Sequence, residues 1–170
     1  MKKHFFIASC LLVFSLSSFS QAQLKIGHLN YEEILFALPE KDSVQAILQK
    51  ESKEYENGYE ELTVQYNKLF DEYQKGLTGY TVVTRKLKED ELLDKQKRMS
   101  EFEQNATAAL QKRNTELLQP IIEKINKAID QLATENDFTY ILDLSKGSVV
   151  FTSKDSQNVT AQVLNLLKHN

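Results

Sequence analysis

One long stretch, residues 41–136, constrains the fold of this chain more than any other feature. It covers over half of the sequence, its only proline is Pro120, and its apolar residues recur with a helical period on both sides of Gly76 and Gly79. Two closely spaced glycines relax the backbone enough for the chain to reverse direction. The sequence therefore predicts two long antiparallel helices that fold back at residues 76–81 and form an arm rather than a globule.

The outgoing helix, about residues 41–75, shows the helical period most clearly. Two rows at seven-residue spacing run along it, one of Leu48, Tyr55, Leu62 and Leu69, and the other of Ser52, Tyr59, Tyr66 and Tyr73. Together the rows have the pattern of a coiled-coil seam in the d and a positions. Tyrosine is bulky and keeps a polar hydroxyl, so we expect this seam to pack less tightly than one of leucine and isoleucine. At 1.5 Å per residue the helix would be roughly 50 Å long, too long to bury itself in a domain of this size.

The return helix changes character along its length. Its first part carries many charges and a thin apolar stripe of Leu92, Met99, Phe102, Ala106 and Ala109. After Leu117 the apolar face widens to Leu118, Ile121, Ile122, Ile125, Ile129 and Leu132. Pro120 lies at this change and is expected to kink the helix, because it removes one backbone donor. The sequence therefore predicts that the C-terminal end of the return helix belongs to a hydrophobic core.

The charge at the tip of the arm is uneven. No acidic residue occurs from Tyr73 to Lys88, and the four basic residues there are Lys75, Arg85, Lys86 and Lys88. Two interpretations remain open: a solvated turn, or a contact with anionic lipid head groups or acidic proteins. Thr78 or Thr81 is expected to cap the return helix.

The two ends of the chain predict short elements of a small body. Residues 24–29 alternate as a strand, and Asn30 has the character of a cap for a helix over Tyr31–Leu38. Asp42 or Ser43 is the expected cap of the long helix that follows.

The C-terminal region predicts a hairpin followed by a helix. Residues 138–144 alternate as a strand, 145–147 form a turn, and 148–152 are the expected partner strand. An amphipathic helix is expected to begin at Asp155 or Ser156. Three short strands give a small core, and oligomerisation through the strands is the simplest way to stabilise it.

Residues 1–22 have the features of a signal peptide. A basic start precedes an apolar run over Phe5–Phe19, and the small residues that follow predict cleavage after Ala22. The run is too short for a convincing transmembrane span. Cys10 follows residues that loosely resemble a lipoprotein processing box, so lipidation at Cys10 stays open as an alternative. The expected product is soluble and exported.

The predicted mature chain, residues 23–170, offers little for catalysis. It has no cysteine, and with 19 basic and 24 acidic side chains its net charge is −5, which argues against general nucleic-acid binding. Its only histidines are His28 and His169, and it has no glycine-rich phosphate loop, nucleophile motif or metal-ligand spacing. We therefore expect no enzyme, no metal and no cofactor, and we expect His28 to be a core or interface residue.

The order of several short blocks resembles the Skp/OmpH family of periplasmic chaperones. The blocks are Lys25–Asn30, Pro120–Ile125, Tyr140–Asp143, Val150–Phe151 and Val159–Leu164. With the signal peptide and the intervening helical arm, the resemblance extends over essentially the whole mature chain.

This resemblance implies a fold and an assembly. The fold is α+β but mainly α, with a small β-containing trimerisation body over 24–40 and 118–170. A long antiparallel coiled-coil hairpin forms the arm over 41–117, with its tip near 76–81. Family members are homotrimers whose arms hang from the body like tentacles. The residues expected to take part in the oligomerisation body are Ile26, His28, Tyr140, Leu142 and Val150.

The resemblance also implies a function. The chain would be an ATP-independent periplasmic holdase that binds unfolded outer-membrane β-barrel proteins between its arms and prevents their aggregation. The expected client-contact residues are Tyr59, Tyr66, Phe70, Tyr73 and Met99. The same tyrosine row also serves the seam, and both roles stay open.

This chain departs from the family in its charge, and one alternative function stays open. Well-known family members are strongly basic, whereas this mature chain is acidic. The tip of the arm is the one region where this chain keeps a basic character like theirs. The alternative function is a trimeric coiled-coil spacer or adaptor of the envelope that binds a folded partner.

Overall fold

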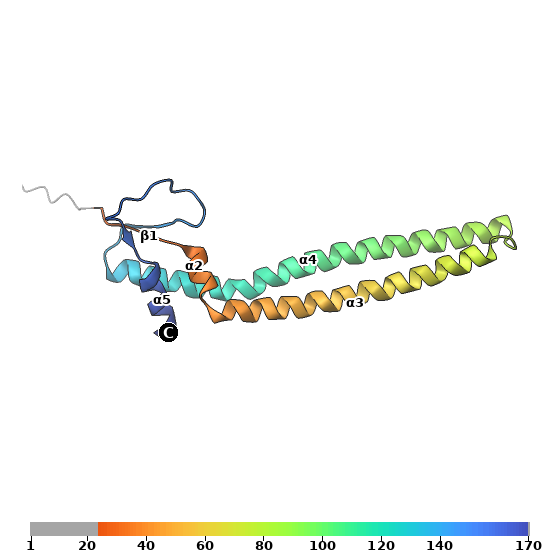
Figure 1. Cartoon of the computed structure of the whole chain (residues 1–170), viewed down its shortest axis with the longest axis horizontal. Coiled ribbons are helices and arrows are strands. Elements are labelled where there is room, and N and C mark those ends of the chain that lie inside the picture. Colours follow the sequence, from red (N-terminus) through yellow and green to blue (C-terminus); the bar gives the residue numbers. More distant parts are fainter. Residues whose placement is uncertain (1–23, 170) are drawn as a thin grey trace, which may run out of the picture.

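The computed structural model describes residues 24–169, and the predicted signal peptide, its cleavage site and Cys10 lie outside them. The elements in chain order are β1 (Ile26–Leu29), α2 (Tyr31–Phe36), α3 (Pro39–Gly76), α4 (Val82–Glu135), β2 (Tyr140–Asp143), β3 (Gln157–Asn158) and α5 (Thr160–His169). Figure 1 shows α3 and α4 side by side as a long arm that projects from a small body containing β1, α2 and α5. The predicted fold class, mainly helical with a small sheet, is confirmed.

Local hydrogen bonds define where the helices begin. The Asn30 side chain accepts a bond from the Glu33 amide at 3.0 Å, which confirms the predicted cap of α2. The Thr81 hydroxyl accepts a bond from the Thr84 amide at 3.2 Å, so Thr81 caps α4. For α3 the prediction was wrong, because the helix begins at Pro39. Proline suits the first turn, where its missing N–H would have no intrahelical partner, so Asp42 and Ser43 lie inside the helix.

The turn at the tip uses glycine for close packing. A Cβ atom on Gly76 would collide with the ring of Tyr80, whose hydroxyl donates to the Glu72 carbonyl at 3.2 Å. Among the described residues, positive φ angles occur at Asp137 and Gly147, and Gly76 and Gly79 have none. The backbone therefore reverses without the left-handed conformation that glycine permits, and the aromatic ring explains why residue 76 lacks a side chain.

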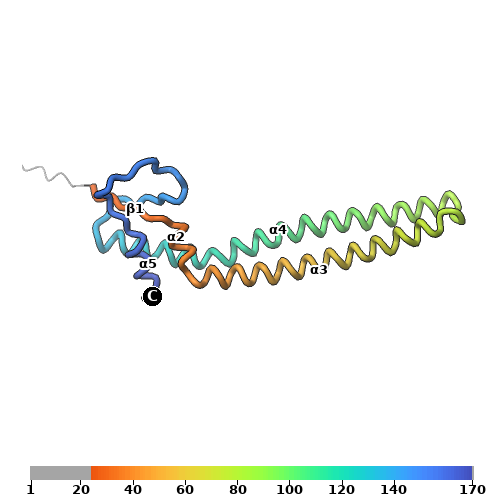
Figure 2. Tube along the Cα trace, viewed as in Figure 1, coloured from red at the N-terminus to blue at the C-terminus, as the bar shows by residue number. Residues whose placement is uncertain are grey.

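The three strands form a parallel sheet in the order β2-β1-β3. The predicted hairpin is wrong, since residues 144–156 form a loop and β2 pairs with β1 instead. Figure 2 shows this segment as a wide loop beside the sheet. The physical reason lies at Asp143, whose carboxylate accepts bonds from the Ser145 amide at 2.9 Å and the Ser145 hydroxyl at 2.7 Å. This local turn directs the chain away from the sheet as soon as β2 ends.

The last helix also begins later than predicted. Gln157 and Asn158 pair with β1, and the Asn158 side chain accepts a bond from the Thr160 amide at 3.0 Å. The helix therefore starts at Thr160 rather than at Asp155 or Ser156.

The hydrophobic core sits in the body. Its most buried side chains come from β1, α2, α4, α5 and the residue between β3 and α5, and they are Leu29, Ile34, Ile125, Val159 and Val163. The wide apolar face of α4 belongs to this core, as predicted, because Ile121, Ile125 and Leu132 are buried there. The helix continues through Pro120, and its axis bends near the base of the arm (Figure 1).

Candidate binding groove along the arm

The tyrosine and leucine rows of α3 lie along the side that packs on α4. Tyr55 meets the ring of Phe102 edge-on at a centroid distance of 6.2 Å. Polar contacts also cross between the helices: Arg113 lies 3.1 Å from the Glu51 carboxylate, and Lys95 donates to Gln65 at 2.7 Å. Most row residues are only half-buried. The helices are thus held by a narrow seam that leaves apolar surface accessible along its sides.

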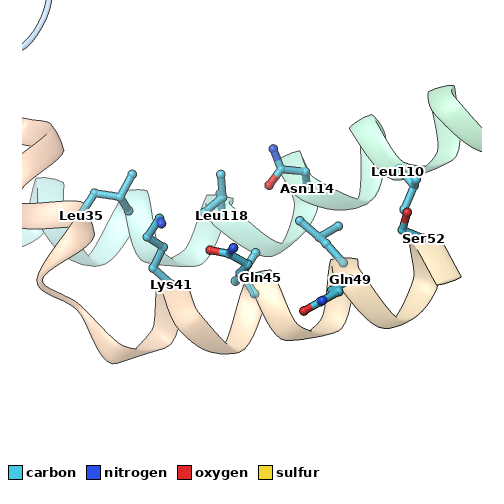
Figure 3. A pocket seen from close by; sticks show the side chains of 10 residues that line it. Leu35, Lys41, Gln45, Gln49, Ser52, Leu110, Asn114 and Leu118 are labelled. Atoms are coloured by element: carbon cyan, nitrogen blue, oxygen red, sulfur yellow. The ribbon is translucent and has the colours of Figure 1, made fainter.

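Two adjoining pockets lie along this seam, and together we call them the arm groove. The base pocket has a volume of about 520 Å³ and is lined by Leu35, Lys41, Val44, Gln45, Leu48, Gln49, Ser52, Leu110, Asn114 and Leu118 (Figure 3). The mid-arm pocket has a volume of about 320 Å³ and is lined by Ser52, Tyr55, Glu56, Tyr59, Phe102, Glu103, Ala106, Thr107 and Leu110. Ser52 and Leu110 line both pockets. Ser52 and Ala106 both line the mid-arm pocket, and their small side chains leave space there between the helices.

The charges of the groove lie at its ends. Lys41 lines the base pocket, and its ammonium group sits 4.1 Å from the ring centre of Phe36. Glu56 and Glu103 line the mid-arm pocket, and Glu56 is paired with Lys53 at 3.0 Å. The surface between them is mainly apolar.

The structure does not bring all the predicted client-contact residues into the groove. Tyr59 lines it with 37% of its surface exposed. Tyr66 and Phe70 lie farther along the arm, stacked at a centroid distance of 6.2 Å. The Tyr73 hydroxyl donates to the Glu89 carboxylate at 2.8 Å, a bond that raises the pKa of Tyr73 above its usual value. Met99 is half-buried and lines neither groove pocket.

Sequence analysis missed most of the groove, because its residues are ordinary seam or flanking positions. The signal that would have revealed it is the small side chain at Ser52 in a row otherwise made of tyrosines, together with Ala106 in the opposite stripe. Whether Ser52 and Ala106 lie at the same level of the arm depends on how the two helices pair, and neither helix specifies this by itself.

The basic tip is partly neutralised. Lys86 lies 2.8 Å from Asp90 and Lys88 lies 2.7 Å from Glu91. The carboxylate hydrogen bonds raise the pKa of both lysines, since they favour the charged form. Lys75 and Arg85 make no ion pair with another residue in the part of the chain that the structure describes.

The tip also presents apolar side chains, which the sequence reasoning overlooked. Val82 is 86% exposed and Val83 is 70% exposed, both in the first turn of α4. Leu87, one turn later, is also exposed. We call Val82, Val83 and Leu87 the apolar tip.

The predicted body residues occupy one face of the sheet and the loop beside it. Ile26 pairs with Tyr140 and His28 with Leu142, so all four share one face, opposite to Leu29 and the core. Ile26, Tyr140 and Leu142 are exposed, whereas His28 is buried as expected for a core or interface residue. Val150, in the loop over residues 144–156, is almost fully exposed.

Residues 24–169 contain no group of three or more histidine, cysteine, aspartate or glutamate side chains placed to hold a metal ion. Within the same range, no helix has the length and apolar character needed to cross a membrane.

Comparison with known proteins agrees with this architecture. The family described as outer membrane protein, OmpH-like, matches residues 25–167. A curated relative, the chaperone protein Skp of Pectobacterium atrosepticum, is 29% identical over 175 residues, which cover 99% of this chain and all of the relative. A crystal structure from Caulobacter crescentus, of a protein described as an OmpH-like outer membrane chaperone, shares the fold. Its TM-score is 0.69 at 12% identity, over 87% of this chain and 86% of that one. The chain therefore belongs to the OmpH-like family, to which the sequence resemblance had pointed.

Proposed function

We propose that this protein is a holdase chaperone that binds unfolded outer-membrane β-barrel proteins and prevents their aggregation. The observation that carries the proposal is the arm groove, an open and mainly apolar surface between two long helices that runs from the edge of the core out along the arm. The family match and the similarity to a chaperone named Skp support it.

The physical chemistry of the client fits such a surface. A β-barrel precursor has alternating apolar residues and unpaired strand edges, and both drive aggregation in water. A holder must bind many sequences weakly, without a deep specific pocket. A shallow groove lined by Leu48, Leu110 and Tyr59 offers contacts of that kind.

We propose that the chaperone acts without ATP, a cofactor or catalysis. The described residues hold no metal-ligand cluster, and the groove contains no paired nucleophile and base. The proposed location is the periplasm, after cleavage of the predicted signal peptide behind Ala22.

We also propose a homotrimer in which residues 24–40 and 118–170 form the body and 41–117 the arm. Supporting this is the exposed apolar sheet face at Ile26 and Tyr140, which a soluble monomer would leave in water. The nearby exposed loop residues Val150 and Phe151 add to that surface.

A second proposed contact is a peripheral one between the arm tip and an anionic membrane. The exposed Val82 and Val83 lie beside Arg85, and apolar groups next to cations favour the interface of anionic lipids.

The decisive experiment mixes the purified mature protein with a urea-unfolded outer-membrane barrel protein and measures the mass of the soluble species. The holdase proposal expects a soluble complex under conditions where the barrel protein alone precipitates. Precipitation of the barrel protein in the presence of this chain would contradict it. Stoichiometric capture of one folded envelope protein, without protection of unfolded chains, would instead support the spacer or adaptor alternative.

A further inference from the structure

The charges of the arm groove are separated by sign along its length. Lys41 is the only charged residue lining the base pocket, and Glu56 and Glu103 are the only ones lining the mid-arm pocket. Neither Lys41 nor Glu103 has an ion-pair partner among the described residues, whereas Glu56 is paired with Lys53. Within residues 24–169, the groove therefore ends in a cation near the body, which contacts the Phe36 ring but no carboxylate, and in a carboxylate without an ion pair in the middle of the arm.

The distance between these charges sets the length of what can join them. Glu103 follows Phe102, whose ring contacts Tyr55 on α3. From Lys41 to Tyr55 the helix rises roughly 21 Å at 1.5 Å per residue. An extended chain covers that distance in about six or seven residues at 3.3 Å each.

The surface between the charges is mainly apolar on both helices, with Gln45, Gln49 and Asn114 among its polar residues. Val44 and Leu48 line it from α3, and Leu110 and Leu118 line it from α4. A strand-like segment with apolar residues at alternate positions would place those side chains against this surface and its polar side chains toward water.

We infer that the arm groove binds an extended polypeptide segment in an orientation set by charge, with an acidic residue beside Lys41 and a basic residue beside Glu103. This rests on the proposed holdase function and adds a charge pattern that distinguishes one client segment from another. An amphiphile with a single anionic head would satisfy Lys41 but leave Glu103 without a partner, so a chain with two opposite ends fits better.

The charges direct orientation more than they add affinity. Glu103 is exposed and Lys41 is partly exposed, so an ion pair with either contributes little because water and salt screen it. Complementary charges at such rims mainly select the partner and fix its register. Peptides with matched and mismatched end charges should therefore differ in affinity by about three- to tenfold at low salt.

The test uses short peptides with blocked termini, about seven residues long, with valine at alternate positions. One peptide carries aspartate at one end and lysine at the other, and two controls carry aspartate at both ends or lysine at both ends. A spin label next to the aspartate reports orientation by broadening methyl signals in the NMR spectrum of the full-length assembly. We expect broadening at Val44 and Leu118 near the base, and little at Ala106 in the middle of the arm.

Charge-swapped variants make the test sharper. The pair Lys41→Glu and Glu103→Lys preserves net charge and should move the broadening to Ala106. The matched control pair Lys50→Glu and Glu101→Lys exchanges the same charge types at exposed positions outside the groove and should leave the broadening at the base. Broadening that stays at the base in the first pair, or moves in the second, would overturn the inference.

The outcomes separate this inference from the function on which it rests. If the three peptides bind equally well and in no fixed orientation, while unfolded barrel protein competes with them, the groove is a client site without charge selection. If none of the peptides binds and the variant Leu110→Gln still protects barrel protein from aggregation, the groove is not the client site, and both the inference and the groove's part in the proposed function fail.

Discussion

The ring of Phe102 packs directly on the bare backbone of Gly58, so that a Cβ atom at Gly58 would lie 2.9 Å from the Phe102 Cζ atom. Gly58 is in the interior of α3, where glycine is usually unfavourable. The close approach explains why glycine occupies this position, and it fixes how the two helices of the arm meet.

This contact gives the first prediction. Replacing an interior helix glycine by alanine normally stabilises a protein by about 1 kcal/mol. We expect Gly58→Ala to give no such gain here, because the methyl group would displace the Phe102 ring. The measurement is urea unfolding at fixed protein concentration, since the stability of the proposed trimer would depend on concentration.

The control for this prediction is the same change in a Phe102→Leu background. There the methyl group finds space, and Gly58→Ala should be more favourable than in the parent by about 0.5–1 kcal/mol, a coupling typical of residues in contact. Identical effects in the two backgrounds would contradict the packing argument.

The second prediction separates the aromatic residues by their position. Tyr59 lines the groove, whereas Tyr73 lies near the tip and is bonded to Glu89. Buried aromatic contacts often dominate binding energy, so Tyr59→Ser should weaken retention of an unfolded barrel protein several-fold. Tyr73→Ser should change retention much less. The dissociation rate of the complex with the barrel protein measures the effect of each substitution. A larger effect for Tyr73→Ser than for Tyr59→Ser would show that the groove is not part of the binding surface.

How far the sequence predicts this molecule depends on whether an element is defined locally. The period along residues 41–136 specified two long helices, because each position repeats the same local information. The sheet is different, since β1 pairs with β2 more than a hundred residues away, and alternation over residues 138–144 cannot tell a hairpin from a parallel partner. The groove was also hidden, because the sequence alone does not bring Ser52 of α3 and Ala106 of α4 to the same pocket.

The third prediction concerns Asp143, which joins β2 to the start of α2. Burial opposes its ionisation, but bonds from the Ser145 amide and hydroxyl and from the Tyr31 amide at 3.1 Å outweigh burial and lower its pKa. A folded-state pKa below the unfolded value stabilises the fold above the unfolded pKa. This stabilisation is lost as the pH falls from about 4 through the folded pKa.

Asp143→Asn should therefore destabilise the body at neutral pH by about 1 kcal/mol, the order of one weakened side-chain hydrogen bond. It should also flatten the dependence of unfolding free energy on pH below pH 4. Asp155→Asn is a suitable control, because Asp155 lies in the exposed loop and makes no side-chain hydrogen bond within the described residues. An equal change in slope for both variants would show that the hydrogen bonds to the Asp143 carboxylate have no special role.

The last prediction concerns the arm tip. Val82 and Val83 are exposed next to Arg85, so they should enter the interface of vesicles rich in anionic lipid while the arginine attracts the surface. The double change Val82→Ser and Val83→Ser should reduce sedimentation with such vesicles several-fold at low salt. Val64→Ser is the matched control, because Val64 is 61% exposed but lies in the middle of α3.

Salt then distinguishes the two parts of the tip contact. Screening by salt should weaken the attraction that Arg85 provides and leave the apolar contact intact. Arg85→Gln should therefore reduce vesicle binding at low salt but change it little above about 0.5 M, where the Debye length falls to a few ångströms. The loss caused by the two serines should persist at both salt concentrations. If Val64→Ser reduces vesicle binding as much as the tip changes do, the contact belongs to the whole arm, and the apolar tip has no separate role in reaching the membrane.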